Sequence, residues 1–331
     1  NYRENMYTTL VDENEYAIKP MNCPGGMLLY GNRPHSYREF PIRAAEIGLV
    51  HRHELSGVLS GLFRVRAFHQ DDAHIFMTPA QIQQEILGVL QLAERLYGTF
   101  GLGFSLELST RPEKSIGTDE QWETATQGLR AALDAYGHAY RINEGDGAFY
   151  GPKIDLHIND ALNRTWQCGT IQLDMSLPER FDLGYIDKDN MRRRPIMIHR
   201  TIFGSIERFF GILVEHFAGN FPLWLAPEQV VVLAMNDELV PYAGEVLAEL
   251  TGFGFKAALD SRTESLNRKI RDAQLRHVPL ILTIGAKEKE NGTLSVRTLD
   301  GKVRFGMTPE QFRKSVLDHI AGRKLDEPIF G

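Results

Sequence analysis

The chain has 331 residues, a net charge of −6 and a hydrophobic fraction of 43%. This length predicts about two domains, and the apolar content excludes a disordered chain. The negative charge argues against nonspecific coating of nucleic acid but is compatible with a local basic face. The sequence has no run of about 18 apolar residues, so we expect no membrane span.

Cys23 and Cys168 are the two cysteines of the chain. They could form one disulfide, but reduced thiols or a metal ligand are more typical of a chain of this size. Cysteines that are not expected to form a disulfide indicate that the protein is located in the cytoplasm.

The first half of the chain has a Pro20–Gly26 turn cluster and then Val50–Phe76, a stretch with alternating ends and a Gly/Ser-rich middle. This pattern predicts two antiparallel strands joined by a mobile loop. Strand side chains alternate between faces, so polar residues gather on one face of each strand. They are Arg52 and Glu54 on the first strand, and Gln70, Asp72 and His74 on the second. A bland solvated hairpin can also be charged, but this mixture of chemistries favours a site.

Helices and strands follow up to residue 222. Thr118 and Gln121 form a capping box that starts one helix, which ends before Gly137. We expect a helix from Thr78 or Pro79 that buries Ile82, Ile86, Val89, Leu90, Ala93 and Tyr97. Strands are expected at Phe104–Ser109, within Tyr140–Ser176 and at Pro195–Arg200. A further helix after Gly204 is expected to bury Ile206, Phe209, Phe210 and Leu213. Residues 1–222 are therefore predicted to form an α+β domain, an antiparallel sheet flanked by helices.

The pattern changes around Asn220–Pro227, and we place a domain boundary there. Beyond it, strands are expected at Val230–Ala234, Phe255–Leu259 and Leu280–Ile284, helices at Leu239–Leu250 and Glu264–Arg276, then a hairpin around Asp300-Gly301 and a final helix. This alternation predicts a small α/β domain with a mainly parallel sheet over residues 227–331.

Cys23, His74 and His199 are candidate metal ligands. One thiolate with two imidazoles makes a three-ligand zinc site with an open fourth position. The spacing is long, and a lone histidine on an apolar strand is more often a satisfied core group.

Arginines form a second group of candidates, because the guanidinium fork binds phosphate with two parallel hydrogen bonds. Arg52, Arg64, Arg66 and Arg208 flank predicted strands or lie on the helix after Gly204. Surface ion pairs would explain any one of them. The sequence has neither a P-loop nor a dinucleotide-binding glycine motif, so a nucleotide would be held by arginines and sheet residues.

Several longer motifs resemble those of one family. V-H-R-H-E with F-R-V-R-A-F is similar to motif 2 of class II aminoacyl-tRNA synthetases, and G-S-I-E-R-F is similar to motif 3. M-N-C-P-G, Q-D-D-A-H-I-F, S-T-R-P-E-K, G-A-F-Y-G-P-K-I-D, W-Q-C-G-T-I-Q-L-D and P-I-M-I-H-R together resemble the threonyl-tRNA synthetases. The resemblance runs through essentially the whole chain and implies a class II catalytic core followed by an anticodon-binding α/β domain.

The resemblance also implies roles for individual residues. Asp72 would accept from the threonine hydroxyl, Arg52 would bind the α-phosphate and the amino-acid carboxylate, and Arg208 would hold the γ-phosphate. The other implied residues are the zinc ligands Cys23, His74 and His199, the catalytic Lys153, the threonine-binding Met21, Gln70, Tyr150, Gln167 and Gln172, the ATP-binding Glu54, Arg64 and Phe68, and the anticodon-binding Glu288 and Arg297.

The implied reaction joins threonine and ATP to threonyl-adenylate and then transfers the threonyl group to threonine tRNA. One Zn²⁺ would read the amine and hydroxyl of threonine, and Mg²⁺ would accompany ATP. We also expect a homodimer in the full-length enzyme. Valine, which has no hydroxyl, should be excluded well, and serine, which differs by a methyl group, poorly.

The sequence departs from the family pattern at several positions. Gly26 and Ser60 stand where the family often has histidine, and Thr263 stands where an asparagine commonly contacts the anticodon. Motif 1 and the N-terminal ubiquitin-like and editing domains have no counterpart here, and without an editing site we expect seryl-tRNA to accumulate.

Two other functions remain as alternatives. One is a catalytically silent synthetase-like module with an RNA-binding or regulatory role. The complete set of zinc and arginine positions argues against this alternative. The other is a zinc hydrolase, although H-E-x-x-H, with its general-base glutamate, is absent from the sequence.

Overall fold

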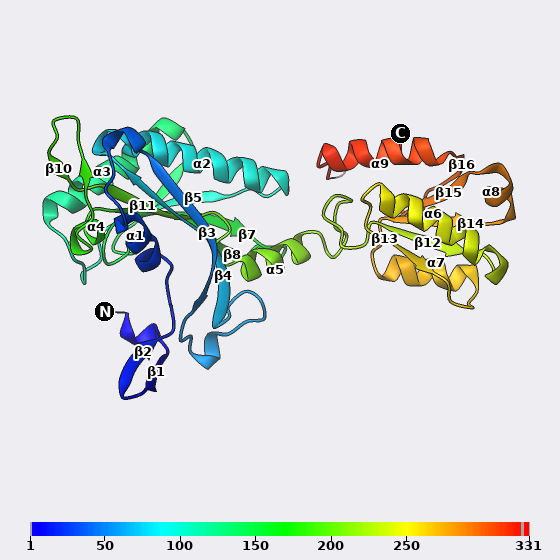
Figure 1. Cartoon of the computed structure of the whole chain (residues 1–331), viewed down its shortest axis with the longest axis horizontal. Helices are drawn as coiled ribbons and strands as arrows, with labels where there is room; N and C mark the ends of the chain where they lie inside the picture. Colours follow the sequence, from blue (N-terminus) through cyan, green and yellow to red (C-terminus); the bar gives the residue numbers. More distant parts are fainter. Residues whose placement is uncertain (1, 326–327, 331) are drawn as a thin grey trace. The chain divides into compact units, whose positions relative to one another are not determined.

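The computed structural model describes residues 2–325 and 328–330. Its contacts divide the chain into two compact units, residues 1–213 and 214–331 (Figure 1). The division falls within helix α5 (Ile206–His216), upstream of the boundary predicted between residues 222 and 227. None of the described helices combines the length and the apolar character that a membrane span requires.

The first unit is built around a seven-stranded sheet. Neighbouring strands are antiparallel except for one parallel pair, β5 with β6. In spatial order the strands are β3 (Ile42–His51), β4 (Ala67–Met77), β11 (Ile196–Thr201), β8 (Thr165–Asp174), β7 (Lys153–Asn159), β5 (Ser105–Ser109) and β6 (Tyr140–Asn143). The predicted antiparallel sheet with flanking helices is confirmed.

Two long helices, α2 (Ile82–Thr99) and α3 (Asp119–Tyr136), pack against one face of this sheet (Figure 1). The six residues predicted to form the buried face of α2 are all buried. Thr118 and Gln121 form the predicted capping box of α3, and Gly137 ends this helix in the left-handed conformation. The helices leave the other face of the sheet for polar side chains.

The remaining elements of this unit are short. They are β1 (Thr8–Val11), β2 (Asn14–Ala17), α1 (Cys23–Gly31), α4 (Leu177–Arg180), β9 (Tyr185–Ile186) and β10 (Arg192–Arg193). Short 3₁₀ turns lie at Arg3–Asn5, Tyr37–Glu39, Ser56–Val58 and Pro79–Gln81. The β1–β2 hairpin was not predicted.

Three predictions for this unit were wrong in detail. The Pro20–Gly26 cluster contains the start of helix α1 at Cys23, because proline is tolerated in the first turn of a helix. Strand β3 ends at His51, so Arg52 and Glu54 follow the strand and do not share one of its faces. Phe210 is 52% exposed, since the buried face of α5 takes Phe209, Ile212 and Leu213.

The second unit contains a five-stranded sheet of order β13-β12-β14-β15-β16. The first three strands are parallel and the last two are antiparallel. Its elements are β12 (Val230–Ala234), α6 (Val240–Gly252), β13 (Ala257–Asp260), α7 (Leu266–Leu275), β14 (Leu280–Ile284), α8 (Ala286–Asn291), β15 (Leu294–Thr298), β16 (Val303–Met307) and α9 (Pro309–Ala321), with a 3₁₀ turn at Asp237–Leu239. The predicted α/β alternation is confirmed, and helix α8 was not predicted.

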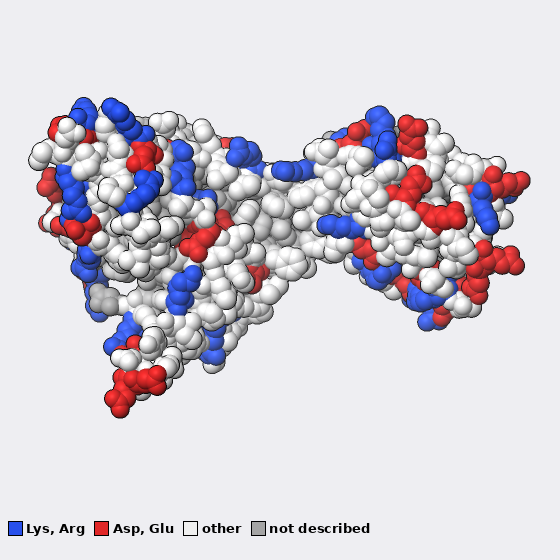
Figure 2. Space-filling view, viewed as in Figure 1, with Lys and Arg blue, Asp and Glu red and all other residues white. Residues whose placement is uncertain are grey.

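Charged side chains of both signs are interspersed on the visible face of each unit (Figure 2). This distribution agrees with the small net charge of the chain.

Candidate active site

A cavity of about 420 Å³ lies on the polar side of the large sheet, within the size range of small-molecule sites. Strands β4, β8 and β11, the segment 52–68 and the start of α5 all contribute to its wall. Of the predicted site residues, those that line it are Met21, Cys23, Arg52, Glu54, Arg64, Phe68, Gln70, Asp72, Tyr150, Gln167, Gln172, His199 and Arg208.

Three potential metal ligands lie together, and two of them, Cys23 and His199, line this cavity. Cys23 begins α1, while His74 of β4 and His199 of β11 face each other across the strand pair. One donor atom of each residue lies within 4.8 Å of the other two. The sequence brings them together because the antiparallel register pairs the two histidines, and the first turn of α1 supplies the sulfur.

The chemistry of these three residues fits zinc. One sulfur and two imidazole nitrogens are a ligand set that zinc prefers. Nε2 of His74 is buried and has no hydrogen-bond partner among residues 2–325 and 328–330, so a donor atom stands ready for an ion. Cys23 and His199 also line the cavity, so a metal held by this group would be near a bound substrate.

The surroundings give the two imidazoles different protonation preferences. Burial, and then the neighbouring His199, lower the pKa of His74. Burial also acts to lower the pKa of His199, but its hydrogen bonds to Asp174 and Cys23 outweigh this and raise it. His74 is therefore ready to bind a metal as a neutral imidazole, whereas a metal at His199 would replace a proton.

Asp72 lies beside the ligand group on β4. One of its carboxylate oxygens, Oδ1, is 3.8 Å from Nε2 of His74, and the other, Oδ2, accepts a hydrogen bond of 3.2 Å from Nδ2 of Asn22. A carboxylate next to the ligands and facing the cavity can accept a hydrogen bond from a small polar substrate.

Two arginines bring positive charge to the wall of the cavity. Arg52 donates through Nε to the Pro20 carbonyl at 3.2 Å, and its guanidinium lies over the Phe68 ring. Arg208 donates to the carbonyls of Phe63 and Gln167, each at 2.8 Å. These contacts hold both guanidinium groups in place, and a preorganised cation suits a phosphate group.

Other predicted residues contact each other within the same wall. Arg64 donates to Glu54 at 3.0 Å. The Tyr150 hydroxyl donates to the side-chain oxygen of Gln172. Burial raises the pKa of Tyr150 well above its ordinary value, so the phenol stays protonated.

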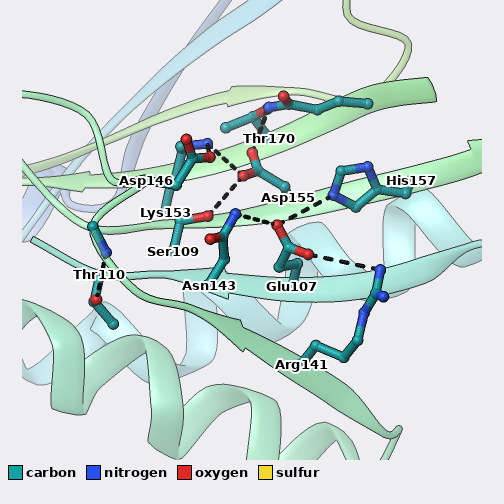
Figure 3. Close-up of polar contacts among 12 residues, drawn as sticks. Glu107, Ser109, Thr110, Arg141, Asn143, Asp146, Lys153, Asp155, His157 and Thr170 are labelled. Carbon is teal, nitrogen blue, oxygen red and sulfur yellow. Dashed lines mark hydrogen bonds and ion pairs between the residues drawn. The ribbon is translucent and has the colours of Figure 1, made fainter. Parts of the chain in front are cut away.

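Lys153 is a predicted catalytic residue that does not line the cavity as the described residues form it. Its ammonium group lies 2.5 Å from Asp155 and 3.0 Å from Asp146 (Figure 3). Asp155 also accepts from Gln167 and Thr170, both of which line the cavity. Lys153 is therefore connected to the site through Asp155.

The same sheet face carries a second group of potential ligands, Glu107, Asp155 and His157 (Figure 3). Here the oxygens of Asp155 already accept from Ser109, Lys153, Gln167 and Thr170. The Lys153 ammonium group therefore already supplies the positive charge that a metal cation would bring to Asp155. We treat this group as a polar support for the cavity wall.

The two predicted anticodon residues lie in the second unit. Glu288 is in α8, where its carboxylate accepts from the Gly285 amide and the Ser295 hydroxyl. Arg297 lies two residues beyond Ser295 on β15 and donates to the Gly301 carbonyl. Thr263 is exposed before α7.

Four polar residues of the site were not predicted. Asp71 accepts from the backbone amides of residues 202, 203 and 204, which fixes the turn before α5. Asp174 supports His199, Asn22 supports Asp72, and Asp155 supports Gln167. All four lie in motifs quoted above, Asn22 in M-N-C-P-G, Asp71 in Q-D-D-A-H-I-F, Asp155 in G-A-F-Y-G-P-K-I-D and Asp174 in W-Q-C-G-T-I-Q-L-D. Their proximity in sequence to candidate residues was the available signal. Both cysteines are free, as favoured from the composition.

Comparison with known proteins gives matches over both units. Residues 7–217 match the tRNA synthetase class II core domain (G, H, P, S and T), and residues 229–319 match the anticodon binding domain. Threonine--tRNA ligases of Desulforapulum autotrophicum and Desulfosudis oleivorans are 72% and 70% identical over 329 residues. These matches cover 99% of this chain and 52% of each relative, so the chain spans about half the length of the curated relatives it matches.

A solved structure is also similar over almost the whole chain. It is the RNA binding domain of threonyl-tRNA synthetase from Cryptosporidium parvum, with a TM-score of 0.91 and 43% sequence identity. The similarity covers 99% of this chain and 82% of that one.

Proposed function

The chain belongs to the threonyl-tRNA synthetase family, with a class II synthetase core and an anticodon-binding domain, and from this premise we propose its reaction. The chain activates threonine with ATP to threonyl-adenylate and pyrophosphate. It then transfers the threonyl group to the 3′ adenosine of threonine tRNA.

One observation carries the proposal. A single cavity is lined by two members of the zinc-type ligand group, Cys23 and His199, by the Asp72 carboxylate and by the guanidinium groups of Arg52 and Arg208. Such a cavity can hold a small polar amino acid beside a polyphosphate. The hydrolase alternative needs a general base beside the metal ligands, and Asp72 is a carboxylate in that position. The two arginines in the same cavity suit phosphate groups and favour the ATP-dependent reaction.

In the first step, the threonine carboxylate attacks the α-phosphorus of ATP, and pyrophosphate leaves. The protein contributes mainly position and charge. Arg52 neutralises the α-phosphate and the attacking carboxylate, and Arg208 neutralises the γ-phosphate. Their main-chain partners, Pro20, Phe63 and Gln167, keep them oriented before substrate arrives. Mg²⁺ accompanies the ATP.

Selection of threonine is assigned to the metal-ligand group and Asp72. Cys23, His74 and His199 would hold the zinc, which would supply a Lewis acid for the amine and hydroxyl of the substrate. Asp72 accepts a hydrogen bond from the hydroxyl. A site built on such polar contacts rejects an analogue without the hydroxyl by about 10⁴–10⁵-fold, whereas one methyl group contributes only about 1–3 kcal/mol. Valine is therefore rejected more strongly than serine.

The second unit supplies the tRNA contacts. Glu288 and Arg297 are the residues we assign to the anticodon. A homodimer and a cytoplasmic location remain part of the proposal on family grounds.

The experiment is ATP–pyrophosphate exchange by this chain with threonine, with valine and without amino acid. Exchange that depends on threonine supports the proposal, and transfer of labelled threonine to threonine tRNA tests its second half. A silent RNA-binding module would bind tRNA without exchange. A zinc hydrolase would cleave simple esters without ATP.

A further inference from the structure

Asn22 is a buried residue with an unusual pair of contacts. It directly precedes α1, and its side chain lies against Gly48 of β3 and Asp72 of β4 and is only 1% exposed. Its Nδ2 donates a hydrogen bond of 3.2 Å to Oδ2 of Asp72. The other atom of the amide, Oδ1, has no hydrogen-bond partner within the described part of the chain.

Helix capping does not explain this residue. Asparagine is favoured before a helix because its side chain accepts from the first-turn amides. Asn22 occupies this position in α1, yet its side chain makes no such hydrogen bond. The amide is directed toward Asp72, and burial of an unsatisfied oxygen opposes that arrangement.

Gly48 of β3 provides the space for the amide. A Cβ atom at this position would lie 2.4 Å from Oδ1 of Asn22 and 2.6 Å from both Cγ and Nδ2. Gly48 does not have a positive φ, so its backbone does not require glycine. The absence of a side chain is what matters here. Because Gly48 has no side chain, the Asn22 amide can occupy the space beside its backbone.

The contact has a consequence for the Asp72 carboxylate. The terminal torsion of an aspartate is broad and rotates readily when nothing holds it. Because Asn22 engages Oδ2, Oδ1 is left on the side of the metal ligands, 3.8 Å from Nε2 of His74. A reversed amide would bring the oxygen of Asn22 against the carboxylate, so Asp72 also fixes the orientation of Asn22.

We propose that Asn22, in the space left by Gly48, is a positioning residue that orients Asp72 and thereby sets discrimination for the hydroxyl of the amino-acid substrate. This inference rests on the proposed function. Asn22 is not among the described residues that line the cavity and acts through the carboxylate of Asp72.

The test compares Asn22→Ala, Gly48→Ala and the double variant with the wild-type chain, all loaded with zinc. The substrates are threonine, 2-aminobutyrate, which lacks the hydroxyl, and serine, which lacks the methyl group. Relative kcat/KM values come from ATP–pyrophosphate exchange, and threonine binding is measured by calorimetry. Asn32→Ala, at the far end of α1, and Gly88→Ala, whose Cβ would meet nothing within 4 Å, are the matched controls.

We expect Asn22→Ala to reduce the preference for threonine over 2-aminobutyrate by at least about tenfold, since one held polar contact to the hydroxyl is lost. The preference for threonine over serine should stay unchanged, because it depends on the methyl group. Gly48→Ala should reproduce the effect, because its Cβ displaces the amide. The double variant should be no worse than Asn22→Ala alone, since the atoms that Cβ would strike are then gone.

Zinc content and the thermal unfolding midpoint show whether each variant is folded and loaded. If Gly48→Ala fails to fold, the result with Asn22→Ala alone tests the inference. That variant removes side-chain atoms and introduces no steric clash. Unchanged discrimination in a folded Asn22→Ala variant overturns the inference and leaves the proposed function standing. A wild-type chain that does not prefer threonine to 2-aminobutyrate overturns the proposed function, and this inference with it.

Discussion

The buried carboxylate of Asp174 accepts a hydrogen bond of 2.9 Å from Nε2 of His199. Its other oxygen accepts from the backbone amides of Ser176 and Leu177, so the shared hydrogen belongs to the imidazole. The second ring nitrogen of His199 is then directed toward Cys23. A carboxylate behind a ligating histidine is a common way to fix the ring and raise its basicity.

We predict that Asp174→Asn weakens zinc binding by about 10–100-fold, because the ring loses its charged acceptor. Competition with a metal chelator gives the affinity directly. Asp182→Asn is the control, since that carboxylate is exposed and pairs with the surface arginines Arg192 and Arg194. Equal zinc affinity in the two variants would refute a supporting role for Asp174.

The two cysteines should respond differently to removal. Cys23→Ala should lose zinc, because two imidazoles alone hold the ion far less tightly than they do together with a thiolate. Cys168→Ala should keep it, although Cys168 lines the same cavity. Metal analysis of the purified variants is the measurement. Equal zinc content in both would rule out the proposed ligand set.

Arg52→Ala and Arg208→Ala should each slow adenylate formation. Removing one preorganised charged donor typically costs about 10²–10³-fold in rate. ATP–pyrophosphate exchange measures the loss, and an unchanged unfolding midpoint shows that the fold is retained. Arg33→Ala removes an exposed arginine and should leave exchange unaffected. Normal exchange in either of the two variants would mean that ATP binds elsewhere.

Lys153 allows a comparison of two carboxylates on one ammonium group. Asp155 is 1% exposed, whereas the Asp146 side chain is 59% exposed. Breaking a buried pair typically costs about 3–5 kcal/mol, and an exposed pair about 0–1 kcal/mol. Asp155→Asn should therefore destabilise the chain much more than Asp146→Asn in denaturant unfolding. Similar losses would show that the Asp155 network does not support the wall.

Arg297→Ala should reduce charging of threonine tRNA but leave adenylate formation nearly unchanged, because its role is assigned to the anticodon. Arg268→Ala is the control, as an exposed arginine of the same unit. Aminoacylation and exchange are measured on the same preparation. A parallel loss in both assays would indicate misfolding or a wrong assignment.

Local sequence patterns were sufficient for most of the fold. The helical spacing of apolar residues predicted the buried face of α2, and the Thr118–Gln121 capping box predicted the start of α3. Both features are present in the structure. These patterns gave wrong predictions where the same residues fit two different structures. Pro24 and two glycines resemble a turn, yet they belong to the first turn of α1. Phe209 and Phe210 are equally apolar, but adjacent residues of a helix point about 100° apart and only one can face the core.

The site was predictable only in part. The resemblance supplied candidate residues, whereas the supporting contacts depend on how segments distant in sequence cross. Asn22 meets Asp72 only because Gly48 leaves a gap in β3. Lys153 is predicted to be catalytic, and its ion pairs with Asp146 and Asp155 were not foreseen. No local pattern encodes either relationship.

The central claim is that zinc, held by Cys23, His74 and His199, makes this cavity selective for threonine. The most direct measurement removes zinc with a chelator, returns it stepwise and follows threonine-dependent ATP–pyrophosphate exchange with the bound metal in the same samples. We predict that exchange is lost with the metal, returns in proportion to bound zinc and levels off at one ion per chain. Full threonine-dependent exchange in the zinc-free protein would contradict the account.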